Sequence, residues 1–346
     1  MSILRLSGVV FGLLGLGLAG WARFHLRRLR NGDWVLASAL SATLLVVGLH
    51  PGVVDVALAP LDFTAGGYGR LVGLLVVTAA VLALLVFVAL ARATRVEKQL
   101  DRLVREMAKR EFRGAHPPEQ SPIFIVIPAY NEGENIGGVL AAMPAEVCGL
   151  RATPIVVVDG ATDNTAQVVG GLNARAVTCV VNRGGGSALR VGYELALERG
   201  AEIVVTLDAD GQHLPEEIPR LVEPILEGRA DLVNGSRVLG TFEKESEVRA
   251  AGVFLFNWLF SLLVLRRITD CSNSFRAIRA DVLGKLELRQ SQFHAAELLL
   301  DAMRKDYRVL EVPITIRRRQ GGVSKKPPSL RYAIGFARAI VSTWLR

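Results

Sequence analysis

Residues 203–213 read IVVTLDADGQH. A short run of aliphatic and β-branched residues is followed at once by two aspartates, Asp208 and Asp210, and then by Gln212. A short apolar run that stops at polar residues is typical of a buried strand in a parallel sheet. Open sheets of this kind bind ligands where their strands end. This stretch therefore predicts an α/β domain whose functional residues follow its strands.

The sequence on either side of this stretch repeats the same alternation. From Ser121 onward, β-rich runs alternate with amphipathic helical stretches. We expect strands at residues 123–127, 154–158, 176–181, 203–207 and 231–234. We expect helices at residues 134–143, 164–172, 187–198 and 215–226. Strands that alternate with helices form βαβ units, so a layered open sheet is the predicted fold.

Acidic residues follow three of these strands. The first strand ends in PAYNE (128–132), the second in DGATD (159–163) and the fourth in DADGQH (208–213). Carboxylates gathered at one edge of a sheet repel one another unless a cation lies among them, and oxygen ligands of this type suit Mg²⁺ or Mn²⁺. We therefore predict a metal site with Asp208, Asp210 and Gln212 as ligands. A solvated turn is the alternative for an isolated Asp-x-Asp pair.

Five motifs occur along the chain in the order IPAYNE (127–132), VDGATD (158–163), DADGQH (208–213), NGSR (234–237) and RQGGVSK (319–325). In this order they resemble the family 2 glycosyltransferases of the dolichyl-phosphate mannosyltransferase type, over residues 122–326. The resemblance implies a GT-A fold, which is a Rossmann-like open sheet. It also implies a metal-dependent hexosyltransferase that moves a sugar from a nucleotide sugar to a polyprenyl phosphate.

The resemblance further implies roles for individual residues. The positions that would bind the nucleotide sugar are Pro128, Tyr130, Asn131, Glu132, Asp159, Asp163, Arg183 and Asp208. Those that would bind the acceptor phosphate are Arg237, Arg319 and Lys325. The catalytic positions are Asp210, which holds the metal, and Asp270 and Glu297, either of which positions the acceptor or acts as a base. A salt bridge on a helix surface is the alternative for Glu297.

The charges of these residues suit a reaction between two anions. A lipid phosphate is already ionised near neutral pH, so its oxygen can attack the anomeric carbon with little help from a base, and cations are needed to bring it beside the donor diphosphate. Arg binds phosphate through two N–H groups and Lys through a point charge. The alternative for the basic run 317–326 is a nucleic-acid or anionic-lipid patch. The acidic clusters argue against a nucleic-acid partner.

Two positions depart from the pattern of the family. Val158 stands where the second-strand motif usually has a first acidic residue, which removes one expected nucleobase contact. Gly185 stands where many relatives carry Lys, and Arg183 is the candidate substitute for its charge. The donor nucleotide therefore stays open. Besides the leading interpretation, the sequence allows a transferase that extends a glycan or glycolipid, and a catalytically silent membrane scaffold with the same fold.

Composition separates the chain from an ordinary soluble enzyme. Its 346 residues include 51% hydrophobic and 21% charged residues, with a mean hydropathy of +0.34, which excludes a disordered chain. The net charge is +8, and residues 317–346 contain eight Lys and Arg but no Asp or Glu. Cys148, Cys179 and Cys271 are odd in number and lack C-x-x-C spacing, which argues against a disulfide framework or a zinc site and suits a reducing cytosol.

The apolar residues are concentrated at the front. Three uncharged runs predict membrane-spanning helices at residues 6–22, 34–54 and 71–91. A cleaved signal peptide is the alternative for the first run. Basic residues follow the first and third runs, which predicts a multi-pass protein of the cell membrane with its catalytic domain in the cytoplasm. In span layout this segment resembles small three-span membrane domains of unknown function.

The chain is thus predicted to have four parts. They are a transmembrane all-α domain at 1–92, a basic amphipathic helix and linker at 93–120, the GT-A domain at 121–326 and an interfacial amphipathic helix at 327–346. The basic helix carries an apolar stripe formed by Val96, Leu100, Leu103, Val104 and Met107. It is predicted to lie on a membrane or a protein surface, and a short coiled coil that makes a homo-oligomer is the alternative. The apolar run 253–265 predicts a further interfacial helix, so the lipid bilayer is an expected partner.

Overall fold

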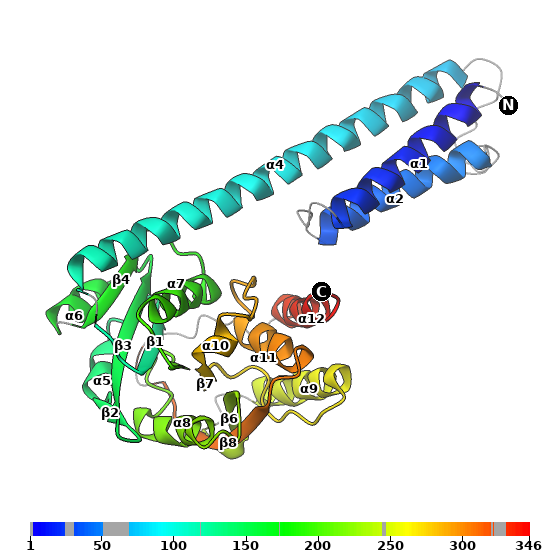
Figure 1. The fold of residues 1–346 in the computed structure, drawn as a ribbon. Helices are drawn as coiled ribbons and strands as arrows, with labels where there is room; N and C mark the ends of the chain where they lie inside the picture. The colour runs from blue at the N-terminus through cyan, green and yellow to red at the C-terminus, as the bar shows by residue number, and fades with distance from the viewer. Residues whose placement is uncertain are drawn as a thin grey trace. The chain divides into compact units, whose positions relative to one another are not determined.

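The computed structural model describes residues 3–24, 31–50, 69–117, 119–172, 174–243, 247–319, 321 and 330–346. The chain divides into two compact units, Met1–Arg102 and Leu103–Arg346. Figure 1 shows the helices of the first unit and the sheet of the second. Of the predicted site residues, Lys325 lies outside the described residues.

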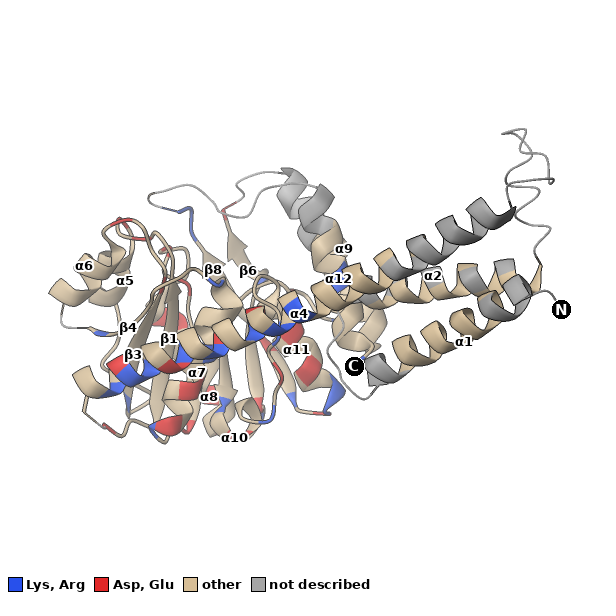
Figure 2. Ribbon diagram, turned by 90° about the horizontal axis from the view of Figure 1, so that it is seen from above, with Lys and Arg blue, Asp and Glu red and all other residues tan. Residues whose placement is uncertain are grey.

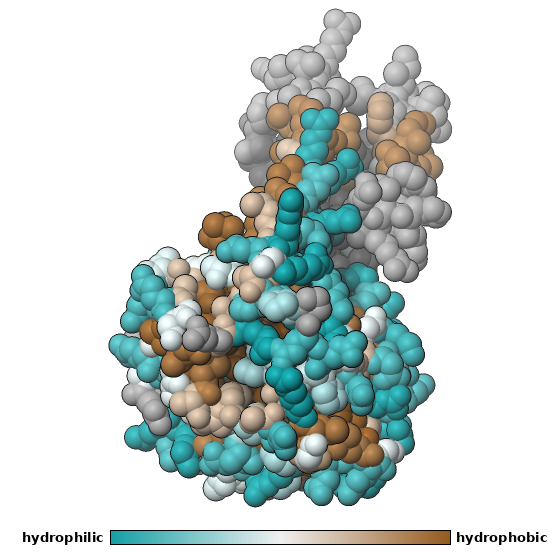
Figure 3. Space-filling view, turned by 60° about the vertical axis from the view of Figure 1, so that its left-hand side comes forward, coloured by the Kyte–Doolittle hydropathy of each residue, from teal (hydrophilic) through white to brown (hydrophobic). Residues whose placement is uncertain are grey.

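The first unit is helical. It contains α1 (Ile3–Phe24), α2 (Asn31–Leu49) and the first part of α4 (Gly69–Ala115). Helices α1 and α2 approach backbone to backbone, because a Cβ at Gly12 would lie 2.7 Å from the Leu45 nitrogen and one at Gly48 would lie 2.5 Å from the Val9 nitrogen. Many of the described side chains are apolar, and these are drawn in brown in Figure 3.

The structure does not support the predicted three-span domain. Within the described part of the chain, no helix combines the length and the apolar composition that crossing a membrane requires. The last part of the second predicted span, residues 51–54, lies outside the described residues.

Helix α4 continues without a break through the predicted third span and the predicted basic helix. Its last part belongs to the second unit and packs on α7 (Gly185–Glu198). Of the predicted apolar stripe, only Val104 is buried, and the other four side chains are exposed. The buried face is instead Val104, Ala108 and Phe112, spaced one helical turn apart.

Ion pairs flank that buried face. The Lys109 ammonium lies 2.6 Å from Glu194 and 3.4 Å from Glu198, and Arg113 lies 2.7 Å from Glu198. Figure 2 shows the alternating charges along this part of α4. The last part of α4 is therefore held on the sheet domain by buried apolar side chains with ion pairs beside them.

The second unit is built on one eight-stranded mixed sheet. Its order is β2-β3-β1-β5-β7-β6-β8, and β4 pairs with β3. The strands are β1 (Ile123–Ala129), β2 (Glu146–Val147), β3 (Leu150–Asp159), β4 (Arg175–Cys179), β5 (Ile203–Thr206), β6 (Leu232–Phe242), β7 (Arg276–Arg279) and β8 (Val309–Ile316). Strands β4, β3, β1 and β5 run parallel, β7 is antiparallel to both of its neighbours, and β8 is parallel to β6. All five predicted strands are present, whereas β2, β7 and β8 were not predicted.

Helices cover both faces of the sheet. They are α5 (Ile136–Ala141), α6 (Thr165–Gly171), α7, the short 3-10 helix η2 (Pro215–Glu217), α8 (Ile218–Leu226), α9 (Glu247–Val264), α10 (Ala280–Leu283), α11 (His294–Arg304) and α12 (Leu330–Trp344). The side chains of β1 alternate between two cores. Phe124 and Val126 pack with residues of α7 and α11, while Ile125 and Ile127 pack with residues of α5, α6 and α8.

The register places the ends of three strands together. Ala129 of β1 lies opposite Val158 of β3, and Val126 lies opposite Thr206 of β5. The turns that follow β1, β3 and β5 therefore lie at one edge of the sheet, as the sequence predicted.

Candidate active site

The turn after β1 is fixed against the turn after β3. Asn131 has a φ of 52°, in the left-handed region that Asn tolerates better than most residues. Its side-chain oxygen accepts a hydrogen bond from the Thr162 nitrogen at 2.7 Å, and its amide donates to the Thr162 hydroxyl at 3.1 Å. Asp163 accepts from the nitrogens of Gly133 and Thr165, each at 3.0 Å. These contacts hold the two turns together and place Asn131 and Asp163 at the strand ends.

Asp159 holds the glycine-rich turn that precedes α7. Its carboxylate is 2% exposed, and it accepts hydrogen bonds from the backbone nitrogen of Arg183 at 3.1 Å and of Gly184 at 2.8 Å. Gly184 has a φ of 88°, so glycine is required there. Asp159 thus holds the backbone of this turn, which carries the predicted donor residue Arg183.

The absence of a side chain at position 185 also has a structural reason. A Cβ at Gly185 would lie 3.2 Å from the His294 ring, and one at Gly186 would lie 1.9 Å from the Gln290 carbonyl oxygen. The segment before α11 occupies the space that side chains at these positions would need. The His294 ring therefore lies against the glycine-rich turn.

The Asp-x-Asp loop is paired with the end of β8. Asp210 accepts from the Gln212 nitrogen at 3.1 Å. The Gln212 side chain donates to the Arg317 carbonyl oxygen at 3.0 Å, and the Arg317 nitrogen donates to the Gln212 carbonyl oxygen at 2.9 Å. These bonds bring the segment after β8 beside the loop.

Arg319 joins two of the acidic clusters. Its Nη2 lies 2.8 Å from the Asp210 Oδ2, and its Nη1 lies 3.0 Å and 3.2 Å from the two carboxylate oxygens of Glu132. The sequence placed Arg319 with the acceptor phosphate, and the structure places it between two carboxylates at the predicted metal and donor positions. Residues from three distant motifs thus meet in one network.

Asp210 and Asp208 offer a suitable place for a divalent cation. Burial and the neighbouring charge of Asp208 raise the pKa of the Asp210 carboxyl. Carboxylates in this situation favour a cation, and Mg²⁺ or Mn²⁺ bound with a diphosphate takes only one or two protein carboxylates. Within the described residues, no group of three or more His, Cys, Asp or Glu forms a metal cluster. Asp208 and Asp210 would therefore suit a metal ion that takes its remaining ligands from a bound diphosphate.

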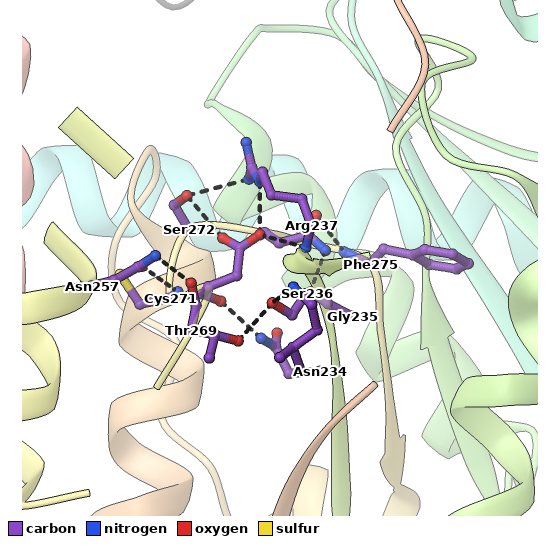
Figure 4. Close-up of polar contacts among 12 residues, drawn as sticks. Asn234, Gly235, Ser236, Arg237, Asn257, Thr269, Cys271, Ser272 and Phe275 are labelled. Carbon is purple, nitrogen blue, oxygen red and sulfur yellow. Dashed lines mark hydrogen bonds and ion pairs between the residues drawn. The ribbon is translucent and has the colours of Figure 1, made fainter. Parts of the chain in front are cut away.

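The NGSR motif lies within β6, and its Arg237 is held by Asp270 (Figure 4). Asp270 is completely buried and accepts from the Arg237 nitrogen at 3.1 Å and from its Nε at 2.7 Å. Nη2 of Arg237 donates to the Ser272 hydroxyl at 3.3 Å. Nη1 has no hydrogen bond to any described residue, and the side chain is 21% exposed. Asp270 therefore orients Arg237 and leaves one guanidinium nitrogen for a ligand.

A chain of hydrogen bonds connects the Asp-x-Asp loop with this arginine. The Asp208 nitrogen donates to Nδ1 of His213 at 3.3 Å, and Nε2 of His213 lies 3.0 Å from Oδ1 of Asn273. The Asn273 amide donates to the carbonyl oxygen of Gly235, two residues before Arg237, at 2.6 Å. The metal-binding candidates and the phosphate-binding candidate thus belong to one polar network.

Glu297 lies elsewhere in the domain. It is 1% exposed on α11 and accepts from the nitrogens of Arg289 at 2.8 Å and Gln290 at 2.6 Å, while Arg346 lies 2.5 Å from its other oxygen. The loop formed by residues 289–291 also contacts the glycine-rich turn, because the Ser291 carbonyl oxygen accepts a hydrogen bond from the Gly186 nitrogen at 2.8 Å. The Glu297 carboxylate therefore holds the backbone of this loop through hydrogen bonds.

The remaining predicted donor residues lie on and directly after β1. Pro128 is within the strand and Tyr130 follows it, and both are half-buried. Sequence reasoning missed two residues that support the site. Glu311 of β8 accepts from the nitrogens of Thr269 and Asp270, and Asn257 of α9 contacts the same loop. The interruption of an apolar run by Asn257 was the signal for the latter.

Comparisons with known proteins agree with this arrangement. The family described as glycosyl transferase family 2 matches residues 124–287. A dolichyl-phosphate hexose transferase from Haloferax volcanii is 32% identical over 211 residues, which cover 61% of this chain and 90% of that protein. The chain belongs to the family 2 glycosyltransferases.

Two other relatives of this glycosyltransferase carry similar names. A polyprenol monophosphomannose synthase from Mycolicibacterium smegmatis is 31% identical, over 58% of this chain and 79% of that protein. An undecaprenyl-phosphate mannosyltransferase from Micrococcus luteus is 30% identical, over 64% of this chain and 93% of that protein.

A solved structure supports the GT-A fold. Glucosyl-3-phosphoglycerate synthase from Mycobacterium tuberculosis, in complex with Mn²⁺, uridine diphosphate and glucosyl-3-phosphoglycerate, superposes with a TM-score of 0.51 at 23% identity. The match covers 65% of this chain and 79% of that one. The predicted GT-A sheet of this glycosyltransferase is therefore confirmed.

Proposed function

We propose that this glycosyltransferase moves a sugar from a nucleotide sugar to the phosphate of a polyprenyl phosphate. The observation that carries the proposal is the orientation of Arg237 by the buried Asp270, which leaves one guanidinium nitrogen for an anion. The strand that carries Arg237 is connected by hydrogen bonds to the Asp-x-Asp loop. Three relatives are named for transfer to polyprenyl, dolichyl or undecaprenyl phosphate, or for the product of such transfer.

The proposed reaction exchanges one phosphate oxygen for another at the anomeric carbon. An oxygen of the acceptor phosphate forms the new bond, the bond to the donor diphosphate breaks, and the nucleoside diphosphate leaves. An ionised phosphate needs no base, whereas a sugar hydroxyl does. Both candidate bases, Asp270 and Glu297, are buried, and each accepts hydrogen bonds with both oxygens. This arrangement favours a phosphate acceptor over extension of a glycan.

We further propose that Mg²⁺ or Mn²⁺ assists the reaction. Asp208 and Asp210 would hold the ion, with Gln212 as a neutral ligand, and the ion would balance the charge of the leaving diphosphate. The buried carboxyl of Asp210 beside Asp208 suits such a cation. Arg319 supplies positive charge to Asp210. The related synthase carries Mn²⁺ in its own structure.

We also propose that the enzyme works at the cytoplasmic face of the cell membrane. Helix α9 exposes Leu255, Trp258 and Leu262, and α12 exposes Ile334 and Trp344. The two helices are in contact, since the rings of Phe256 and Phe336 lie 4.5 Å apart. Apolar side chains on neighbouring helices of this type suit an interfacial position on a bilayer.

A groove beside α9 adds the complementary charge. It has a volume of about 480 Å³, and Trp258, Leu262, Leu265, Arg266 and Arg267 are among the residues that line it. Apolar walls with two guanidinium groups match a lipid that carries a phosphate. A lipid acceptor is consistent with this surface.

The proposal is tested by incubating the purified full chain and Mn²⁺ or Mg²⁺ with labelled nucleotide sugars and vesicles that contain polyprenyl phosphate. We expect label from one nucleotide sugar in the organic phase. Because hydrogen bonds to charged groups are worth about 1.5–3 kcal/mol, R237A should raise the acceptor KM by roughly 10- to 100-fold. The control R220A removes an exposed arginine of α8 that pairs with Glu217 and should leave transfer unchanged. Equal transfer to the unphosphorylated polyprenol would refute the proposed acceptor.

A further inference from the structure

The loop at residues 269–272 presents the carboxylate that orients Arg237, and it is held from two sides. On one side, Glu311 of β8 accepts from the nitrogens of Thr269 at 2.7 Å and Asp270 at 3.0 Å. On the other side, the Asn257 amide donates to the Thr269 carbonyl oxygen, and its oxygen accepts from the Cys271 nitrogen at 2.9 Å. The backbone of Asp270 is thus fixed immediately before and immediately after the residue (Figure 4).

Asn257 is an unusual residue for its place in the fold. It belongs to α9, in which residues 254–264, FLFNWLFSLLV, are apolar apart from Asn257 and Ser261. Its side chain is 6% exposed, whereas the neighbouring Leu255 and Trp258 are 60% and 63% exposed. A buried amide is costly unless both of its polar ends are paired. Both ends of Asn257 are paired, and both partners belong to the loop that carries Asp270.

Ser261, one turn further along α9, provides a comparison. Its hydroxyl accepts from the Ile268 nitrogen at 2.9 Å and donates to the Asn257 carbonyl oxygen at 2.7 Å. It therefore ties α9 to the residue before Thr269 and makes no contact with the backbone that flanks Asp270. The two polar residues of the helix have separable roles.

We propose that Asn257 is a positioning residue for the acceptor phosphate. It acts through the loop backbone on Asp270, and through Asp270 on the guanidinium of Arg237. Because Asn257 lies on the helix that exposes the apolar side chains, the geometry of Arg237 depends on the position of α9. This inference rests on the proposed function and adds a residue that sets acceptor affinity through Asp270 and Arg237.

The variants follow from the two hydrogen bonds. Asn257→Leu removes both with little change in volume, and Asn257→Asp keeps the bond from the Cys271 nitrogen but has no donor for the Thr269 oxygen. A hydrogen bond contributes about 1 kcal/mol, and the buried carboxylate of the Asp variant would also face the Thr269 oxygen. We therefore expect the acceptor KM to rise about tenfold or more in both variants. The donor KM should change less than twofold. S261A is the matched control on the same helix and should leave both KM values unchanged.

A double-mutant cycle separates positioning from general stability. If Asn257 acts through Arg237, N257L should raise the acceptor KM in the wild-type background and have no further effect in R237A. A purely structural role would give equal losses in both backgrounds, which would overturn the proposal. Thermal unfolding of each variant identifies any that fail to fold, and N257D then serves in place of N257L.

The test also distinguishes failure of the inference from failure of the proposed function. If the wild-type chain transfers no sugar to polyprenyl phosphate, the proposed acceptor is wrong. The positioning of Arg237 can then be read from its modification by phenylglyoxal, measured by peptide mass spectrometry. Release of Arg237 from Asp270 should make N257L react faster than the wild type and S261A. Equal rates in all three would refute the role of Asn257.

Discussion

At the scale of single residues, the site is defined by how it balances negative charge. Asp210 is buried, its neighbour Asp208 adds a second carboxylate, and Arg319 lies 2.8 Å from Asp210. The same arginine contacts Glu132 from the turn after β1. One guanidinium thus occupies a position between carboxylates that a divalent ion would also favour. A divalent ion would therefore compete with Arg319 for Asp210, and this leads to two predictions.

The first concerns the carboxylate itself. Asp210→Asn keeps the size of the side chain but removes the charge that a metal and its diphosphate require. We expect sugar transfer to fall by at least about a hundredfold, the order found when one stabilising group is removed from a reaction centre. The measurement is the initial rate at saturating donor and Mn²⁺. Asp281→Asn is the control, because this exposed carboxylate only pairs with Arg279. Activity retained in D210N would rule out this aspartate as a metal ligand.

The second concerns the internal cation. Arg319→Gln removes the positive charge that lies between Asp210 and Glu132, so a divalent ion no longer competes with it. Without nucleotide, we expect the variant to bind Mn²⁺ about tenfold more tightly, since exchange of one charged contact is worth at least about 1.4 kcal/mol. Electron paramagnetic resonance of free Mn²⁺ during titration gives the affinity. Unchanged or weaker binding in R319Q would show that Arg319 does not compete with the metal.

At the scale of elements, α4 shows which helical face meets the sheet domain. Phe112 is 1% exposed and packs in the core with Val104 and Ala108, while Met107 is 54% exposed. Phe112→Ala should lower the free energy of unfolding by about 3–5 kcal/mol, the usual cost of a buried Phe. Met107→Ala is the matched control and should change it by less than about 0.5 kcal/mol. Chemical denaturation followed by a probe in the sheet domain distinguishes the two. Equal losses of stability would mean that Met107 is packed as tightly as Phe112, on the face predicted from the sequence.

The edge formed by β6, β7 and β8 is fixed by another carboxylate. Asp231 accepts from the nitrogen and side chain of Arg308, which lowers its pKa to about 2, and Arg279 also contacts it. A pKa below the unfolded value means that Asp231 stabilises the fold above the unfolded pKa of 3.8 and loses this effect as the pH falls toward 2.

Asp231→Asn should therefore lower the Tm at pH 7 by about 2–4 °C, the change expected for about 1 kcal/mol in a domain of this size. The difference between variant and wild type should shrink steadily as the pH falls from about 4 to about 2, between the unfolded and the folded pKa. Calorimetry across this range measures it, and E146Q, which neutralises an exposed carboxylate of β2, is the control. A difference independent of pH would mean that the ion pairs of Asp231 do not stabilise the edge.

At the scale of the whole molecule, local patterns predicted the parallel strands β1, β3, β4 and β5 and also β6, but not β2, β7 and β8. Strands β1, β3, β4 and β5 are apolar runs that stop at polar turns, so their position is visible in sequence. Strand β7 has only four residues, RAIR, and β8 contains Glu311 and Pro313, which weaken a strand pattern. Proline is tolerated in β8 because this strand lies at the edge of the sheet.

The same limit applies to the site. The residue types at the strand ends were predicted, because each motif follows its own strand. The meeting of Arg319 with Asp210 was not, since these residues are 109 positions apart and are joined only by the pairing of β8 with β6 and with the Asp-x-Asp loop. The role of Asp270 as the partner of Arg237 likewise depends on antiparallel β7, which places residue 276 beside Asn234.

The proposed acceptor must place its phosphate at Arg237 while its hydrocarbon chain remains in lipid. The surface around α9 must therefore face the lipid. Leu262→Glu places a charge on the exposed face of α9, where the wild-type side chain is 56% exposed. Loss of one buried Leu contact with lipid is worth about 1.5–3 kcal/mol, so transfer to long-chain polyprenyl phosphate in vesicles should fall about tenfold or more. Transfer to a short-chain, soluble isoprenyl phosphate should be unchanged, because the phosphate site is intact. Leu172→Glu, on the exposed end of α6, is the control and should affect neither acceptor. An equal loss with both acceptors would locate the effect of L262E in the site itself and contradict a lipid-facing α9.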